Sequence, residues 1–244
     1  MRHFLVIVVI LSLSLGACKK AGDRTCWKGQ GDLDSLVLGL DSISSFKLLK
    51  DIKYNLYESD EKKMVVRGGE NMIPQIGLSY DANELTVSNG NKCHFFRSGE
   101  RFIEVDIYYP SYSDLYIEAS DSVIFQDTIH SDIQIEMRNG GGSLLLNVDN
   151  NSTKMVVSLG TADFTIAGET NYAELKVQNN GFGKASNLSA NSIFAFQNST
   201  ADLYLNFEGA DVLVLIEGTG DAFYKGIASQ IDLQGNGSGK LLEY

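Results

Sequence analysis

Two glycine-rich runs near the end of the chain contain the residue types that hold phosphate groups in nucleotide-binding proteins. The runs are EGTGDAFYKG at residues 217–226 and GNGSGK at residues 235–240. A phosphate-binding loop needs the spacing G-x-x-x-x-G-K-[ST]. Here Leu241 follows the glycine–lysine pair, and Gln234 occupies the place of the first glycine. The first run also matches LGTADFTIAG at residues 159–168, so we interpret the glycines as corners of a repeat and not as a phosphate site.

Aspartates recur at one corner position of that repeat. Asp163, Asp202 and Asp221 occupy it, and Lys184 and Lys240 occupy the same column in other units. If successive units stack about 4.8 Å apart, Asp202 and Asp221 become neighbouring like charges. Such a pair would suit a glycosidase or a Ca²⁺ site. The alternative, which we favour, is a solvated ladder partly neutralised by lysine. We predict no cofactor and keep Asp202 and Asp221 as the weak metal candidate.

Other catalytic arrangements have little support in the sequence. His94 and His130 lie far apart in the pattern, and no G-x-S-x-G nucleophile motif is present. Arg138 is the only arginine after residue 112, so the basic cluster that would neutralise an acidic sugar is missing. We therefore predict a protein that is not an enzyme, with a glycan-active enzyme as the weaker alternative.

Four tyrosines crowd the region just before the repeats, and they are the candidate ligand-binding residues. They are Tyr108, Tyr109, Tyr112 and Tyr116. Because side chains alternate along a strand, some of the four should point to solvent. Exposed tyrosines stack on sugars and anchor protein interfaces. The alternative is that two line the core and two cover the open end of the repeats.

The N-terminus has the features of an export signal. Arg2 is followed by the apolar run 4–15, which is too short to cross a bilayer comfortably, and then by LGAC at residues 15–18. This stretch resembles the lipobox of bacterial lipoproteins. The resemblance implies a signal peptide at residues 1–17, lipidation of Cys18 and, because Lys19 follows, an outer-membrane lipoprotein on the periplasmic face or cell surface.

The two remaining cysteines, Cys26 and Cys93, would then lie in a compartment that permits disulfides. We predict that they are bonded to each other, with two free or buried thiols as the alternative. Metal binding is disfavoured, because His94 beside Cys93 has no further histidine or cysteine at ligand spacing.

Composition and patterning favour an all-β chain. The formal net charge of −11 disfavours nucleic acid as a partner, since phosphate contact needs clustered lysine and arginine. The sequence has 24 glycines and only 2 prolines, which suits many turns. Residues 18–45 read as a polar tether with a short helix or loop near its end, where Leu36, Leu40 and Ile43 have helix-like spacing. Residues 46–112 alternate apolar and polar side chains in short strands.

From residue 113 to residue 244 the chain repeats itself with a period of about 20 residues and two strands per period. A small residue precedes one strand by two positions in most units, as at Gly142, Gly220 and Gly239. The first apolar residues of that strand are Val123, Leu144, Phe164, Ala185, Leu203, Ala222 and Leu241. The other strand carries Leu115/Ile117, Ile133/Ile135, Met155/Val157, Leu175/Val177, Ile193/Ala195, Leu213/Leu215 and Ile231/Leu233. The pattern predicts a β-solenoid of about seven coils, because one such unit cannot bury its apolar face alone.

The lipobox, the strand-rich N-terminal part and the closing glycine corners together resemble the "putative auto-transporter adhesin, head GIN domain" family, over about residues 46–242. The resemblance implies a right-handed β-helix and supplies no catalytic residues. It leads us to expect a membrane-tethered protein that binds a glycan or a protein. The alternative is a structural module in which coils stack end to end into a homo-oligomer.

Overall fold

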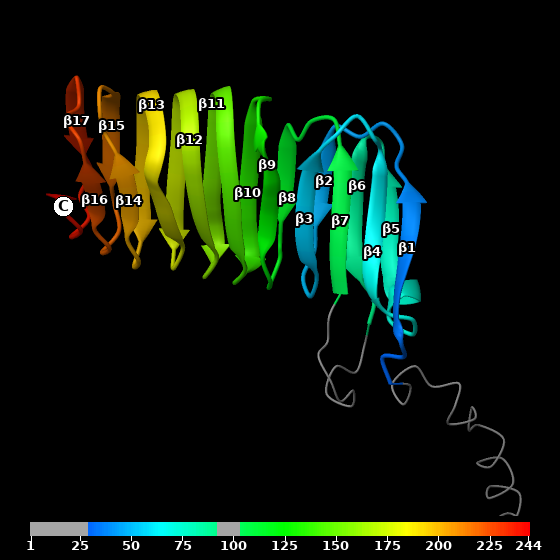
Figure 1. Ribbon diagram of the computed structural model, residues 1–244. Helices are drawn as coiled ribbons and strands as arrows, with labels where there is room; N and C mark the ends of the chain where they lie inside the picture. Colours follow the sequence, from blue (N-terminus) through cyan, green and yellow to red (C-terminus); the bar gives the residue numbers. More distant parts are fainter. Residues whose placement is uncertain (1–28, 92–102) are drawn as a thin grey trace, which may run out of the picture.

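The computed structural model describes residues 29–91 and 103–244, and these form one elongated stack of short β-strands (Figure 1). A single hydrophobic core runs the length of the stack, from Leu40 to Ala222. Among the described residues the only helical element is the 3₁₀ turn η3 (Ile73–Gln75), and no helix has the length and apolarity needed to cross a membrane. The prediction of an all-β chain is therefore confirmed.

Strands β8 to β18 form the solenoid. Their bounds are β8 (Asp114–Ile117), β9 (Val123–Ile129), β10 (Ile133–Gly140), β11 (Ser143–Gly160), β12 (Asp163–Asn179), β13 (Phe182–Ser199), β14 (Leu203–Asn206), β15 (Asp211–Ile216), β16 (Ala222–Lys225), β17 (Gln230–Gln234) and β18 (Leu241–Glu243). The three long strands bend around a corner and contribute to both faces of the coil. Every pairing between these strands is parallel, with partners about one repeat apart in sequence. The solenoid makes about six turns, close to the seven coils expected; its right-handedness stays a prediction from the resemblance.

The strands before residue 112 extend the same stack instead of forming a separate sheet. They are β1 (Leu33–Gly39), β2 (Ser45–Leu48), β3 (Lys53–Glu58), β4 (Lys63–Gly69), β5 (Ile76–Asp81), β6 (Glu84–Asn89) and β7 (Ile103–Tyr109). Strands β2 and β3 pair in parallel with β8 and β9, and β6 and β7 pair in parallel with β2 and β3. Antiparallel strands β1, β4 and β5 complete this end of the molecule.

Strand β1 corrects the expectation of a short helix or loop near residue 36. It pairs along its whole length with β4, so its backbone hydrogen bonds run to a neighbouring strand and not within a helical turn. Leu36 and Val37 are both exposed, at 41% and 61%, which shows that the three- and four-residue spacing of apolar residues did not mark a buried helix face.

Two details of the predicted coil alignment are also wrong. Phe164 is paired with Gly183 and not with Ala185, because a register shift after Thr165 places Ala185 and Ser186 both inside. A side chain at Gly183 would collide with Phe164, whose ring fills that level of the core. In β15 the inward residues are Val212 and Val214, so the predicted pair Leu213/Leu215 points outward.

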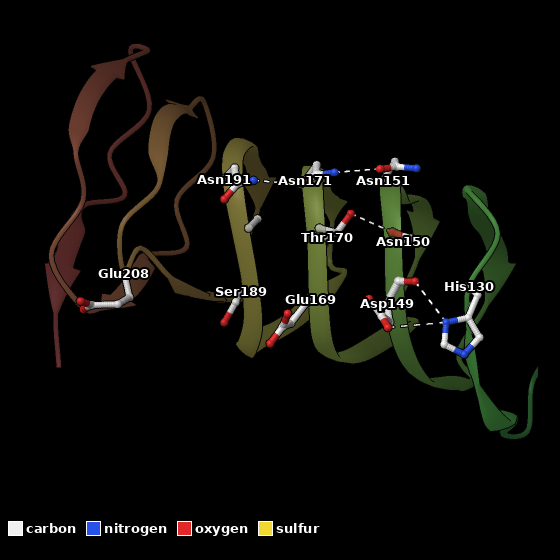
Figure 2. A pocket seen from close by; sticks show the side chains of 11 residues that line it. His130, Asp149, Asn150, Asn151, Glu169, Thr170, Asn171, Ser189, Asn191 and Glu208 are labelled. Carbon is white, nitrogen blue, oxygen red and sulfur yellow. Dashed lines mark hydrogen bonds and ion pairs between the residues drawn. The ribbon is translucent and has the colours of Figure 1, made fainter.

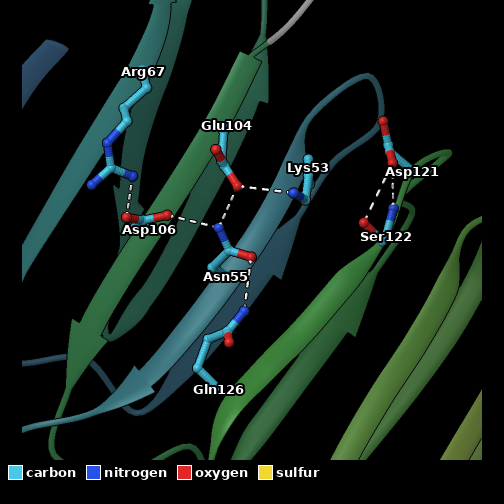
Figure 3. Close-up of polar contacts among 8 residues, drawn as sticks. All are labelled: Lys53, Asn55, Arg67, Glu104, Asp106, Asp121, Ser122 and Gln126. Atoms are coloured by element: carbon cyan, nitrogen blue, oxygen red, sulfur yellow. Dashed lines mark hydrogen bonds and ion pairs between the residues drawn. The ribbon is translucent and has the colours of Figure 1, made fainter.

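A polar network fastens β3, β4 and β7 on their outer face (Figure 3). The Arg67 guanidinium pairs with Asp106, and the Asn55 amide donates to Asp106 at 2.8 Å and to Glu104 at 2.6 Å. Burial alone would raise the pKa of Glu104, but hydrogen bonds from Asn55 and Lys53 bring that pKa below its ordinary value. Asp106 is a charged residue buried to 2% exposure, and this network is what compensates it.

Candidate functional site

A polar groove lies along one corner of the solenoid, where β11, β12 and β13 turn from one face to the other (Figure 2). It encloses about 400 Å³ and crosses several coils. Nearly all of its lining side chains are amides, hydroxyls, carboxylates or imidazole. They are His130, Asp149, Asn150, Asn151, Glu169, Thr170, Asn171, Ser189, Ala190, Asn191 and Glu208. We call these residues the polar groove.

One rim of the polar groove is a ladder of asparagines at the same position of successive coils. Asn191 donates to Asn171 at 2.8 Å, and Asn171 donates to Asn151 at 2.8 Å. Beside it, the Thr170 hydroxyl donates to the Asn150 side chain at 2.8 Å. The parallel, in-register strands bring these side chains together, since identical positions repeat at every coil. The ladder fixes the rotamers of its members and leaves the groove preformed.

Carboxylates form the other side of the groove. Asp149 and Glu169 are register partners on adjacent coils, Ser189 follows on the next coil, and Glu208 lies beyond it (Figure 2). The His130 imidazole contacts Asp149, with Nδ1 at 3.3 Å from its carbonyl oxygen and 3.7 Å from its carboxylate. Both side chains are more than half exposed, at 63% and 69%. The groove is thus acidic and open to solvent.

An aromatic shelf adjoins the polar groove, beginning one residue further along β12 and β13. It encloses about 490 Å³ and combines Tyr172, Phe194 and Leu213 with the polar side chains of Asp211 and Asp232. Lys176 lies over the Phe194 ring at 5.2 Å from its centroid. Polar groove and aromatic shelf together offer hydrogen-bonding groups beside apolar rings, which is the composition of sites that orient small polar ligands.

The structure brings Asp202 and Asp221 to adjacent coils as predicted, but both carboxylates are used by the backbone. Asp202 Oδ1 accepts from the Asp221 N–H at 3.1 Å, and Asp221 Oδ1 accepts from the Lys240 N–H at 2.8 Å. Lys184 does not join this column, because Phe182 stands opposite Asp163 and Lys184 pairs with Thr165. Among the described residues, no group of three histidine, cysteine or acidic side chains could hold a metal ion. The corner aspartates therefore fasten one coil to the next.

The four candidate tyrosines divide into two pairs. Tyr109 and Tyr112 are buried, and their hydroxyls donate to the carbonyl oxygens of Ile43 and Ile107 at 2.9 and 2.7 Å. These two cannot contact a ligand, because the core encloses them. Tyr108 and Tyr116 are half-buried on the outer faces, and Tyr108 stacks on Tyr57 with ring centroids 4.5 Å apart.

Cys18, Cys26 and Cys93 all lie outside the described residues, so lipidation and the disulfide stay predictions. The polar groove was missed by the sequence reasoning, although one signal was present. Asn151, Asn171 and Asn191 recur at a spacing of 20 residues, and an exposed asparagine at a constant repeat position predicts a ladder.

Comparison with known proteins places the fold. Residues 44–228 match the family model described as "Putative auto-transporter adhesin, head GIN domain". A putative adhesin from Bacteroides fragilis NCTC 9343 has a TM-score of 0.77 at 18% identity, covering 87% of this chain and 97% of its own. A putative adhesin from Parabacteroides distasonis ATCC 8503 has a TM-score of 0.62 at 18% identity, covering 88% of this chain and 98% of its own.

A putative lipid binding protein, also from Parabacteroides distasonis ATCC 8503, has a TM-score of 0.61 at 14% identity, covering 88% of this chain and 98% of its own. No curated protein matches. Identities this low show the fold alone, and the structures that share it carry different functional descriptions. The function must therefore be argued from the site.

Proposed function

The chain belongs to the head GIN domain family of putative auto-transporter adhesins, and from that premise we propose that it is a lipid-anchored envelope protein that binds glycan through the polar groove. The observation that carries the proposal is the regular row of amides, hydroxyls and carboxylates across successive coils. Sugar hydroxyls both donate and accept hydrogen bonds, so they match such a row. A preformed groove also loses little conformational entropy on binding.

The negative charge of the groove limits the class of glycan that it can bind. Asp149, Glu169 and Glu208 would repel uronic acids and sulfated sugars, whereas neutral or amino sugars meet no such repulsion. The aromatic shelf supports the same class, since an aromatic ring packs against the apolar face of a sugar ring. We therefore propose a neutral or amino-sugar polymer lying across several coils, with its apolar faces toward Tyr172 and Phe194.

We propose binding without catalysis. The acid–base pair His130–Asp149 is more than half exposed, in surroundings close to water. Catalytic acids and bases are usually tuned by burial and by close neighbours. The amide ladder of the groove and the Thr170–Asn150 pair hydrogen-bond within themselves, which suits recognition. We assign the two other carboxylates, Glu169 and Glu208, to ligand contact and not to acid–base chemistry.

Blocking the groove tests the proposal. Ser189→Arg places a long cation at an exposed position among the groove carboxylates, without touching the core. We expect it to weaken glycan binding at least about tenfold, because the guanidinium fills the groove and pairs with the neighbouring acids. Binding would be found on a glycan array and measured by calorimetry on the best ligand.

Thr200→Arg is the matched control, since Thr200 is also exposed but lies outside the polar groove. It should bind as the unmodified chain does. Equal binding by both variants would show that the groove is not the site. An array without binders, together with saturable binding to a protein, would replace glycan by protein as the ligand.

The anchor is tested separately. Cys18→Ser removes the thiol that would carry lipid, so we expect the chain to move from the detergent phase to the aqueous phase in detergent partitioning of cells, and to stop incorporating labelled fatty acid. Cys26→Ser is the control and should keep both properties. Detergent-phase recovery of Cys18→Ser would rule out lipidation at this residue.

A further inference from the structure

Strands β13 and β15 carry apolar side chains on both of their faces, unlike the strands around them. Their inward residues, such as Ile193 and Val212, are buried in the core, and their outward neighbours are large apolar groups as well. We call these outward residues the apolar face: Phe194, Phe196, Leu213 and Leu215. The corresponding outward residues of β10, β12 and β17 are charged or polar: Gln134, Glu136, Glu174, Lys176, Asp232 and Gln234.

Every described strand belongs to the stack, so within residues 29–91 and 103–244 no element lies over the apolar face. Its residues form two neighbouring columns that run along the stack. Phe194 and Leu213 are register partners in the first column, and Phe196 and Leu215 are partners in the second. All four are half-buried, because strands at about 4.8 Å on either side shield them while their outer surface stays open. A contiguous apolar patch of this kind marks an interaction surface.

The polar groups that flank the apolar face are arranged so that each column complements the other. On β12, Glu174 stands in the first column and Lys176 in the second. The two side chains form an ion pair within the chain. On β17, Asp232 stands in the first column and neutral Gln234 in the second. A partner surface with the two columns exchanged would therefore bring opposite charges together at β12 and would set no like charges against each other at β17.

We propose that the apolar face is a self-association surface and that its occupant is a second copy of this chain, packed face to face about a twofold axis along the stack. Such an axis lies between the two columns and exchanges them, so the first column of one copy meets the second column of the other. Phe194 then packs on Phe196 of the second copy, and the leucines pair in the same way. Lys176 faces Glu174 of the second copy at two symmetric positions. The surface is thus complementary to itself in both its apolar and its charged groups.

The layer that carries the apolar face is large enough for a stable dimer. Strands β8, β10, β11, β12, β13, β15 and β17 lie side by side in it, so it is about 30 Å long at about 4.8 Å per strand. Residues 152–158 of β11 span about 23 Å across it at about 3.3 Å per residue. Each copy would cover about 700 Å², against about 800 Å² per partner in stable complexes. At the rim, Asp211 would lie near Glu217 of the second copy, but both are exposed and water screens them.

The contact also affects the proposed binding site, because Phe194 and Leu213 belong to the aromatic shelf as well. This consequence rests on the proposed function, whereas the dimer itself does not. If the proposed function is right, a glycan on the shelf and the second copy compete for these side chains, so the ligand should dissociate the dimer. An axis along the stack leaves both copies with β1 at the same end (Figure 1), so two N-terminal anchors could attach to one membrane.

Self-association is tested on residues 19–244, which include every described residue, by sedimentation velocity over a range of concentrations. We expect a reversible monomer–dimer equilibrium. Lys176→Glu and Glu174→Lys each set like charges against each other at two places, so each should raise the dissociation constant at least about tenfold. An equal mixture of the two variants should associate again, because every like-charge pair becomes an opposite pair while the ion pair within each chain stays lost.

Lys184→Glu is the matched control, since it makes the same change of charge at an exposed position on the other outer face and should leave the dimer unchanged. A strict monomer at high concentration would overturn the proposal, and so would two weakened variants that stay apart when mixed. Larger assemblies that neither variant disrupts would replace this contact by end-to-end stacking. A glycan that binds and leaves the dimer intact would reject the competition for Phe194. An array without binders would leave the sedimentation result standing, so the two proposals fail separately.

Discussion

Arg67→Met is expected to lower the free energy of unfolding by about 3 kcal/mol, because it leaves the buried carboxylate of Asp106 without its cation. The stability lost should differ between the two partners of the ion pair. Asp106→Asn removes the buried charge and leaves Arg67, whose side chain is 43% exposed, free to be solvated, so about 1–2 kcal/mol is expected. A simple account in which the ion pair contributes one fixed energy predicts equal losses.

The free energy of unfolding is measured by urea unfolding, followed by far-ultraviolet circular dichroism, on the unmodified chain and on both variants. Lys53→Met provides the matched control, since the Lys53–Glu104 pair at 3.0 Å belongs to the same network but its carboxylate is less buried, with a side-chain exposure of 16% against 3% for Asp106. Its loss should cost less than about 1 kcal/mol. Equal costs for Arg67→Met and Lys53→Met would mean that Asp106 is not held mainly by its arginine.

The sequence predicted most strands correctly where alternation is strict and one face is apolar. Ile103, Val105 and Ile107, which alternate with Glu104 and Asp106, are the clearest case, and all three are buried. The repeat after residue 112 was equally visible, because a stacked coil imposes its inward residues at a constant spacing. Corner glycines could also be recognised by their recurrence in the repeat. They recur because the backbone of the neighbouring coil leaves no room for a side chain.

The errors arose where local alternation does not determine which side faces inward. In β15, DVLVLI is apolar on both faces, so only its pairing with β13 and β17 decides that Val212 and Val214 are inside. At Gly183 the size of Phe164 on the coil below determines the register. The stacking of β6 and β7 beyond β2 and β3 is a contact between segments that are not consecutive, and no periodicity reports it.

The candidate site was harder to predict from the sequence than the fold. Tyrosine type alone suggested ligand contact at Tyr109 and Tyr112, but their hydroxyls find carbonyl partners inside the core, which lets a large polar-tipped ring be buried. The polar groove consists of residue types that are common in turns. Only their recurrence at one repeat position separates Asn151 and Asn171 from ordinary loop residues.

Gly220→Ala is expected to lower the free energy of unfolding by about 3 kcal/mol, although it adds a single methyl group. A Cβ at Gly220 would stand 2.1 Å from the Ala201 carbonyl oxygen of the neighbouring coil, which is backbone and cannot rotate away. The corner would have to move. That movement also disturbs buried Gln197, whose amide donates to the Ala201 and Asp221 carbonyl oxygens at 2.6 and 3.2 Å.

Gly39→Ala separates this steric cost from the general effect of removing a glycine. A Cβ at Gly39 meets nothing within 4 Å, and its backbone has no positive φ, so the change should be neutral or slightly stabilising. Thermal unfolding of both variants, with proteolysis at the corner as a second readout, compares them directly. If Gly220→Ala unfolds like Gly39→Ala, the coils can separate at that corner at little cost, and the glycines are not required by backbone contact. A large loss confined to Gly220 would show that the spacing between coils itself demands a residue without a side chain, which is why glycine recurs there without any phosphate to bind.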